Sequence, residues 1–259
     1  MHRKKLLPII ASSLLVAGAN FAQAEEKQEA IVTGDTLVEG ITISGNVSLI
    51  SDYKFRGISQ SNKDGALQGG FDAEFGPGFY VGTWGSSVNF DTNGEDGGCC
   101  NGSLELDYYG GWGTDIGDTG FSVDMGYIYY SYPGDNDNDA DYQEVYASGS
   151  WQALTVGVHY SDDYYLESDE FWYVYGDYSF NLPWDLSLSL HAGYNVIEED
   201  GGFLSSDEDG YTDYSVSLSK TLWGVDWAIA YTGTDLDDDD LFGNNWGDNE
   251  VIYSMSKSF

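Results

Sequence analysis

The stretch from Ile41 to Arg56, ITISGNVSLISDYKFR, alternates apolar and polar residues over its whole length. Side chains of a strand point to opposite faces in turn, so this pattern predicts a β-strand whose two faces meet different surroundings. At ~3.3 Å per residue the strand would be roughly 50 Å long, beyond a typical globular strand. A tilted strand that crosses a membrane and projects above it fits that length better.

The same alternation recurs along the chain, separated in turn by long acidic segments and by short turns. Short turns on one side and long loops on the other are typical of a transmembrane antiparallel up-and-down β-barrel with an even number of strands. A soluble β-sandwich also alternates, but it gives no reason for acidic loops to alternate with tight turns. We therefore predict an all-β barrel of about twelve strands with short periplasmic turns and long acidic extracellular loops. The predicted strands are 41–56, 67–75, 79–90, 103–113, 121–132, 142–151, 154–160, 171–180, 184–196, 211–221, 225–234 and 250–259.

The first residues have the organisation of a secretory signal. A basic start at Arg3 is followed by an apolar run and by the small-x-small site Ala22-Gln23-Ala24. We expect residues 1–24 to be a cleaved signal peptide, 25–40 a periplasmic segment and 41–259 the barrel. This organisation predicts the outer membrane of a Gram-negative cell, with outer-membrane lipid and the barrel-assembly machinery as partners.

The charge balance argues against nucleic acid as a partner. Without the three basic residues of the leader, 6 basic residues face 44 acidic ones, a net charge of −38. A nucleic-acid-binding protein needs a basic surface to neutralise phosphates, so we expect no nucleic acid.

The 21 tyrosines, 12 phenylalanines and 8 tryptophans argue against disorder, because they fall in regular strand-like runs. Several tryptophans lie near predicted strand ends, where aromatic girdles of membrane barrels occur: Trp84, Trp112, Trp151, Trp184 and Trp223.

Residues 51–88 carry a resemblance to a known family. The matching motifs are FRGISQS at Phe55 to Ser61, QGGFD at Gln68 to Asp72, GFYVGTWGS at Gly78 to Ser86 and, more weakly, ELDYYGGW at Glu105 to Trp112. These residues resemble the Gcw_chp family of Gram-negative outer-membrane proteins, also labelled TorF-family porins. The resemblance implies an outer-membrane barrel that acts as a porin, and it brings no catalytic residues.

The predicted lumen is acidic. Such a wall would repel anions and concentrate cations, so we expect a passive channel for small hydrophilic solutes that favours cations or zwitterions. Lys54 and Arg56 would face inward within reach of Asp72 or Glu74 across the first hairpin, as a bracing ion pair or as a charged constriction. The residues predicted to line the pore are Asp52, Lys54, Arg56, Asp72, Glu74, Glu105, Asp107, Asp124 and Asp185.

Other features suggest weaker possibilities. Cys99 and Cys100 are adjacent, so an exported chain could form a strained vicinal disulfide or simply a stiff loop. Acidic loop runs such as 237–240 could bind divalent cations weakly, although a solvated surface is the simpler interpretation. No cofactor is implied.

Two other function classes stay open. A surface-interaction barrel would act through its acidic loops. A barrel hydrolase would need a triad, and the nearest candidates are His191, Ser187, Ser189 and Asp185. Neighbours on one face of a strand are roughly 6–7 Å apart, too far for direct hydrogen bonds, so we do not expect an enzyme.

Overall fold

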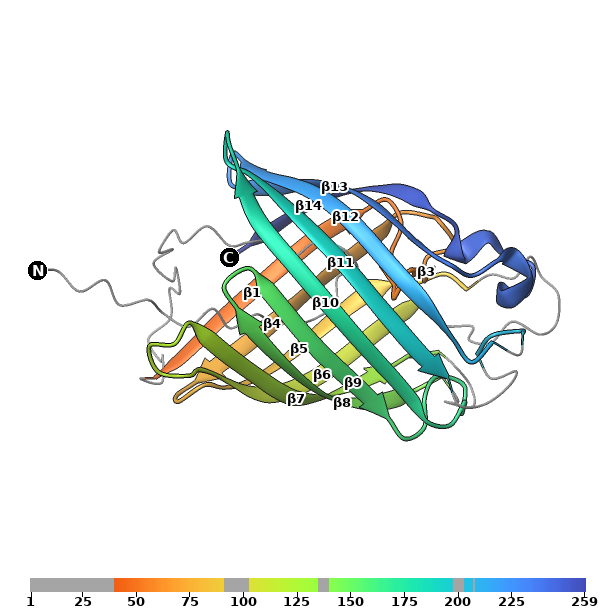
Figure 1. Ribbon diagram of the computed structural model, residues 1–259, viewed down its shortest axis with the longest axis horizontal. Coiled ribbons are helices and arrows are strands. Elements are labelled where there is room, and N and C mark those ends of the chain that lie inside the picture. Colours follow the sequence, from red (N-terminus) through yellow and green to blue (C-terminus); the bar gives the residue numbers. More distant parts are fainter. Residues whose placement is uncertain (1–39, 91–102, 135–139, 198–202, 207) are drawn as a thin grey trace, which may run out of the picture.

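The computed structural model describes residues 40–90, 103–134, 140–197, 203–206 and 208–259. Within them, twelve antiparallel strands close into a barrel, each paired with its neighbour in sequence, and β1 closes against β14 (Figure 1). The predicted twelve-stranded barrel is therefore confirmed. Its strands are β1 (Ile41–Ile50), β4 (Ala66–Phe75), β5 (Phe79–Ser87), β6 (Leu104–Asp115), β7 (Phe121–Ser131), β8 (Tyr142–Trp151), β9 (Leu154–Ser161), β10 (Phe171–Leu182), β11 (Leu186–Ile197), β12 (Gly210–Leu222), β13 (Val225–Thr234) and β14 (Glu250–Ser258).

Four short elements lie in the connections. A two-stranded sheet is formed by β2 (Lys54–Phe55) and β3 (Ile58–Ser59), and two 3-10 helices, η1 (Asp238–Leu241) and η2 (Asn245–Gly247), lie between β13 and β14. Neither helix, nor any other in the described ranges, is long and apolar enough to cross a membrane.

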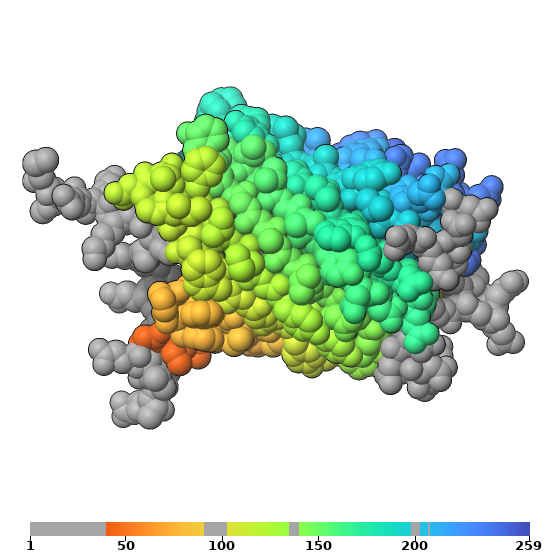
Figure 2. Space-filling model, turned by 60° about the horizontal axis from the view of Figure 1, so that its bottom comes forward, coloured from red at the N-terminus to blue at the C-terminus, as the bar shows by residue number. Residues whose placement is uncertain are grey.

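The outer face of the barrel is apolar along every strand. Exposed valines, leucines and isoleucines such as Val47, Val156 and Val174 lie on this face, and Figure 2 shows one side of the barrel as a continuous outer surface. Phenylalanines and tryptophans gather at the short-turn end and tyrosines toward the long-loop end. An apolar band between aromatic girdles is the outer surface of an outer-membrane barrel. The exposed aromatic residues include Phe75, Phe79, Phe121, Trp151, Trp184, Trp223, Trp227 and Phe259 at the short-turn end, and Tyr108, Tyr127, Trp172, Tyr194, Tyr231 and Tyr253 toward the other.

The short turns and the C-terminus lie at one end of the barrel, as predicted (Figure 1). Two details of the sequence prediction were wrong at strand ends. Trp84 points into the barrel and is buried, so it belongs to no girdle. Trp184 and Asp185 both have positive φ and form an exposed turn, so β11 begins two residues later than predicted and Asp185 is not on the inner wall.

Tyrosine rings lie flat on glycines of the neighbouring strand along the inner wall. A Cβ added to Gly157 would lie 2.5 Å from the ring of Tyr175, and one added to Gly193 would lie 2.4 Å from the ring of Tyr173. The absent side chain leaves the space that the ring fills. These pairs hold bulky rings against the wall, and the same arrangement joins Tyr109 to Gly82 and Tyr146 to Gly126.

The first strand is shorter than predicted. β1 ends at Ile50, and Tyr53 and Phe55, which the period-two pattern placed on the outer face, are buried inside the barrel. The alternation continues past Ile50 because residues 54 and 55 form β2, a second short strand inside the barrel.

The assignment of the outer face to lipid predicts that a charge placed on that face destabilises the barrel more than a charge placed on the inner face. Replacement of Val156, which faces outward on β9, by Arg should destabilise the folded barrel by about 1–4 kcal/mol, because a charged group in the apolar band has lost its water. The measurement is reversible unfolding in phospholipid vesicles. Thr155→Arg, at the next residue and facing the lumen, is the control. Equal destabilisation by both changes would contradict the assignment of the faces.

Candidate functional site

The segment after β1 folds into the barrel interior, and we call residues 51–65 the lumen hairpin. Tyr53 packs its ring on Trp84 of β5, Phe55 packs on Tyr130 of β7, and a Cβ on Gly57 would lie 3.0 Å from Cβ of Asp213 on β12. Residues so close in sequence can contact strands on opposite walls only from within the lumen. The lumen hairpin therefore occupies the end of the barrel that carries the long loops, and Figure 1 shows β3 at that end.

A tight turn places Arg56 at the tip of the lumen hairpin. Phe55 pairs with Ile58, and the two residues between them, Arg56 and Gly57, have φ of 47° and 81°. Positive φ at both central positions is the signature of a type I′ turn, which suits the twist of a hairpin. Glycine is required at the second position for space as well as for φ, because its Cβ would lie 2.3 Å from Cγ2 of Thr234.

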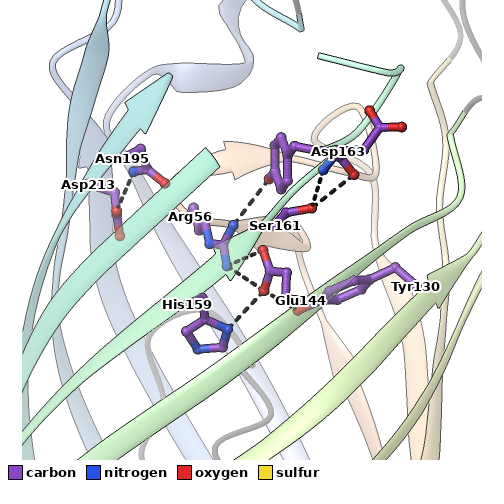
Figure 3. A network of polar contacts seen from close by, with 9 residues as sticks. Arg56, Tyr130, Glu144, His159, Ser161, Asp163, Asn195 and Asp213 are labelled. Atoms are coloured by element: carbon purple, nitrogen blue, oxygen red, sulfur yellow. Dashed lines mark hydrogen bonds and ion pairs between the residues drawn. The ribbon is translucent and has the colours of Figure 1, made fainter. Parts of the chain in front are cut away.

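Arg56 and Glu144 form a buried ion pair at the centre of the site (Figure 3). Nη2 of Arg56 donates to Oε2 of Glu144 at 2.8 Å and lies 2.7 Å from Oε1, and neither side chain has any solvent exposure. Glu144 also accepts from Nδ1 of His159 at 2.8 Å and from the Tyr130 hydroxyl at 3.3 Å. Burial disfavours the charged form of Arg56, but Glu144 more than offsets this and holds the pKa of Arg56 above its usual value.

Lys54 attaches the lumen hairpin to the connection between β13 and β14. Its Nζ donates to the main-chain oxygens of Trp246 at 3.1 Å and Asp248 at 2.6 Å. Burial lowers the pKa of Lys54, and the carboxylates of Asp52 and Glu250 act in the opposite direction. Asp52 in turn accepts from the Ser59 and Ser61 hydroxyls, so it braces the base of the lumen hairpin rather than lining a passage.

Tyr53 fixes the other side of the lumen hairpin. Its hydroxyl donates to Oε1 of Glu105 at 2.8 Å, and burial followed by the charge of Glu105 raises the pKa of Tyr53 well above its usual value. Asp107 lies two residues further along β6 and is also buried, and its Oδ1 has no hydrogen-bond partner among the described residues. Both acids therefore face the packed half of the lumen.

The inner wall toward the short-turn end carries the other predicted acids. Asp72 accepts a hydrogen bond from the Tyr109 hydroxyl, and Asp124 accepts from the Tyr80 hydroxyl at 2.9 Å. Glu74 points inward on β4 beside Asp72 and is half-buried. Tyr80 is also hydrogen-bonded to Tyr146, and a tyrosine hydroxyl from another strand holds each of the acids Asp72 and Asp124.

The predicted pairing of Lys54 and Arg56 with Asp72 or Glu74 was wrong. The prediction assumed that residues 51–56 continue the wall beside β4, whereas the chain leaves the wall after Ile50 and crosses the lumen. The residues that surround Arg56 from the far wall, Tyr164, Phe171 and Tyr173, were not predicted. Alternation identifies a face, but it does not tell which wall a loop will reach.

His191, the candidate base of a triad, is held by acids and a tyrosine. Its Nδ1 lies 2.7 Å from Oδ1 of Asp177, and its Nε2 lies 2.9 Å from Oδ1 of Asp213 and from the Tyr173 hydroxyl. Asp185, the acid considered for that triad, lies in the exposed turn. This arrangement gives His191 structural partners on the two strands that flank β11, namely β10 and β12.

The loop features are only partly described. Cys99, Cys100 and residues 135–139 and 198–200 lie outside the described residues. Asp141 accepts from the main-chain N–H of Tyr132 and the Tyr129 hydroxyl. In the described ranges, no group of three or more His, Cys, Asp or Glu side chains is placed to hold a metal ion.

The family comparison matches almost the whole barrel region. The model of the family described as "Bacterial protein of unknown function (Gcw_chp)" matches residues 35–259. The chain belongs to the Gcw_chp family. The predicted resemblance is thereby confirmed, and a search of curated proteins gave no match.

Solved structures share the barrel fold with this Gcw_chp protein at low identity. A membrane-protein structure titled "Unveiling the Mechanism Behind the in-meso Crystallization of Membrane Proteins" has 11% identity and a TM-score of 0.50, with 84% of this chain and 83% of that chain covered. The KdgM porin has 10% identity and a TM-score of 0.49, with 84% and 97% covered. The NanC porin has 12% identity and a TM-score of 0.47, with 83% and 98% covered.

The buried ion pair predicts unequal effects of single and double substitutions. Arg56→Ala should destabilise the folded barrel by about 3–5 kcal/mol, because it leaves the Glu144 carboxylate buried without its cation. Arg56→Met combined with Glu144→Leu should cost clearly less than Arg56→Ala, because it removes both charges and keeps the volume, and the remaining cost is that of the His159 and Tyr130 hydrogen bonds to Glu144. Unfolding by denaturant in detergent measures both. A double variant as unstable as Arg56→Ala would contradict the assigned pairing.

Proposed function

We propose that this Gcw_chp protein is an outer-membrane channel through which small hydrophilic solutes diffuse passively, with a preference for cations or zwitterions. The observation that carries the proposal is the negative charge of the side chains on the inner wall. No inward-facing position of the twelve described strands is Lys or Arg, whereas Lys220 and Lys257 face outward near the short turns. An acidic wall in a confined space concentrates cations and repels anions. Its inward acids include Asp72, Glu74, Asp124, Asp177 and Asp213.

The two halves of the lumen differ in how much space their side chains fill. Toward the short-turn end the inner wall of β11 to β14 carries short side chains, mostly serines such as Ser217, Ser219 and Ser256. Toward the long-loop end the lumen hairpin packs against tyrosines. A twelve-stranded barrel lies between the filled eight-stranded and the wide sixteen-stranded classes, so this hairpin determines how much of the passage is open.

The packed lumen hairpin also supports a second candidate function. A barrel filled at its long-loop end could act through its acidic loops as a surface-interaction protein rather than as a pore. Conductance separates the two candidates.

The channel proposal predicts the behaviour of the purified barrel in a planar bilayer under a salt gradient. We expect discrete steps with a cation-selective reversal potential. Neutralising the inner wall by Asp72→Asn, Asp124→Asn and Asp177→Asn together should move that potential toward zero, because the fixed charge that excludes anions has been removed. Asp118→Asn, in an exposed short turn, is the matched control.

A second variant tests the role of the lumen hairpin. Replacing residues 53–60 by a short glycine linker should increase the unitary conductance, because the side chains that fill the long-loop end are gone. Anion-selective steps would contradict the acidic-wall mechanism. Absence of steps from both the folded natural chain and the shortened variant would refute the channel and favour the surface role.

A further inference from the structure

The Arg56 side chain is enclosed by aromatic rings as well as by Glu144. Its guanidinium carbon lies 4.4 Å from the ring centroid of Tyr173, 4.7 Å from Phe55, 4.9 Å from Phe171 and 5.7 Å from Tyr164. The Tyr164 hydroxyl accepts from Nη1 at 3.3 Å. Aromatic faces attract a cation within about 6 Å, and a carboxylate binds a guanidinium through charge-assisted hydrogen bonds.

Most of this enclosure belongs to the barrel rather than to the lumen hairpin. Phe171 and Tyr173 come from β10, Glu144 from β8 and Tyr164 from the connection between β9 and β10. Phe55 is the one ring that the lumen hairpin itself supplies. We call Glu144, Tyr164, Phe171 and Tyr173 the guanidinium cage.

The guanidinium cage has supports that do not depend on Arg56. Glu144 is positioned by His159 and Tyr130, the Tyr173 hydroxyl contacts His191 and Asp213, and the ring of Tyr164 stacks on Phe171 with centroids 3.8 Å apart. Side chains that are fixed by contacts with one another keep their positions when the bound group leaves. The guanidinium cage is therefore preorganised, and binding costs little conformational entropy.

The occupant is held in an unfavourable manner. Arg56 has a φ of 47°, which few residues other than glycine adopt, and its buried Nε has no hydrogen-bond partner among the residues that the structure describes. A free guanidinium would meet the same rings and carboxylate without a strained backbone.

We propose that the guanidinium cage is a binding site for solutes that carry a guanidinium group, and that Arg56 fills it as a tethered ligand. A free guanidinium solute competes with Arg56 for the cage and so favours displacement of the lumen hairpin. The binding site stands without the proposed function, but its effect on passage rests on the channel. The chemistry selects a planar cation, since a flat guanidinium can stack on aromatic faces and donate hydrogen bonds to both oxygens of a carboxylate, whereas an ammonium is a compact point charge. Lys54, by comparison, ends on main-chain oxygens.

The test is chemical rescue of Arg56→Ala with guanidinium chloride at millimolar concentration, far below denaturing conditions. The variant vacates the cage and leaves Glu144 in place. Bound guanidinium should stabilise the folded barrel, and at twice its dissociation constant the folded-to-unfolded ratio should rise about threefold. Urea, the neutral isostere, and sodium chloride at equal concentration should give no such rise. Lys54→Ala, in which Arg56 still fills the cage, should respond much less to guanidinium.

A stable Arg56→Ala barrel that responds no differently to guanidinium, urea and sodium chloride would overturn the proposed site. If the variant does not fold by itself, the refolded yield becomes the readout, and failure of guanidinium to raise that yield equally overturns the site. Conductance of the natural chain gives an independent arm. Methylguanidinium should increase open-channel time relative to tetramethylammonium at the same ionic strength, and no difference would refute the competition. Cation-selective conductance without a guanidinium effect would leave the channel standing and remove only this site.

Discussion

The ion pair between Arg56 and Glu144 joins a cationic segment to the interior of an acidic barrel, and much of the lumen is organised around it. Three of the five Lys and Arg residues in the described chain, Lys54, Arg56 and Lys63, lie in the lumen hairpin. A charge placed away from water is costly unless an opposite charge and hydrogen bonds meet it. The wall supplies the acids that this segment needs, and the segment supplies the bases that the wall lacks.

Tyrosine hydroxyls resolve the remaining difficulty, which is that the wall holds more carboxylates than the lumen hairpin can neutralise. The pairs Tyr53–Glu105, Tyr80–Asp124, Tyr109–Asp72 and Tyr173–Asp213 each give a carboxylate a neutral donor. A hydroxyl satisfies the lone pairs of an acid without cancelling the negative charge of the lumen. The glycines beside the rings leave room for them against the wall. The carboxylates can thus be hydrogen-bonded by neutral hydroxyls while the passage keeps its negative charge.

The barrel could be predicted from the sequence because its strands alternate between residues that face lipid and residues that face the lumen, and this gives the sequence a period of two. Every backbone group in a membrane must be paired, which closure alone achieves for strands, and the alternation of the two faces follows directly. Strands such as Tyr142–Trp151 and Val225–Thr234 were predicted to the residue. The lumen hairpin could not be predicted in the same way. Tyr53 and Phe55 keep the alternation of the wall while lying inside it, and the partner of Arg56, Glu144, is 88 residues distant in sequence.

Amide hydrogen exchange of residues 51–65 in the folded barrel tests the central claim most directly, namely that this segment is packed inside the lumen. The Tyr53 N–H donates to the buried Ser61 hydroxyl, and the Gln60 N–H donates to the Tyr53 carbonyl. Our account predicts exchange as slow as that of the adjoining strands β1 and β4, because solvent reaches these amides only when the lumen hairpin unfolds. Exchange as fast as that of an unstructured loop would contradict it.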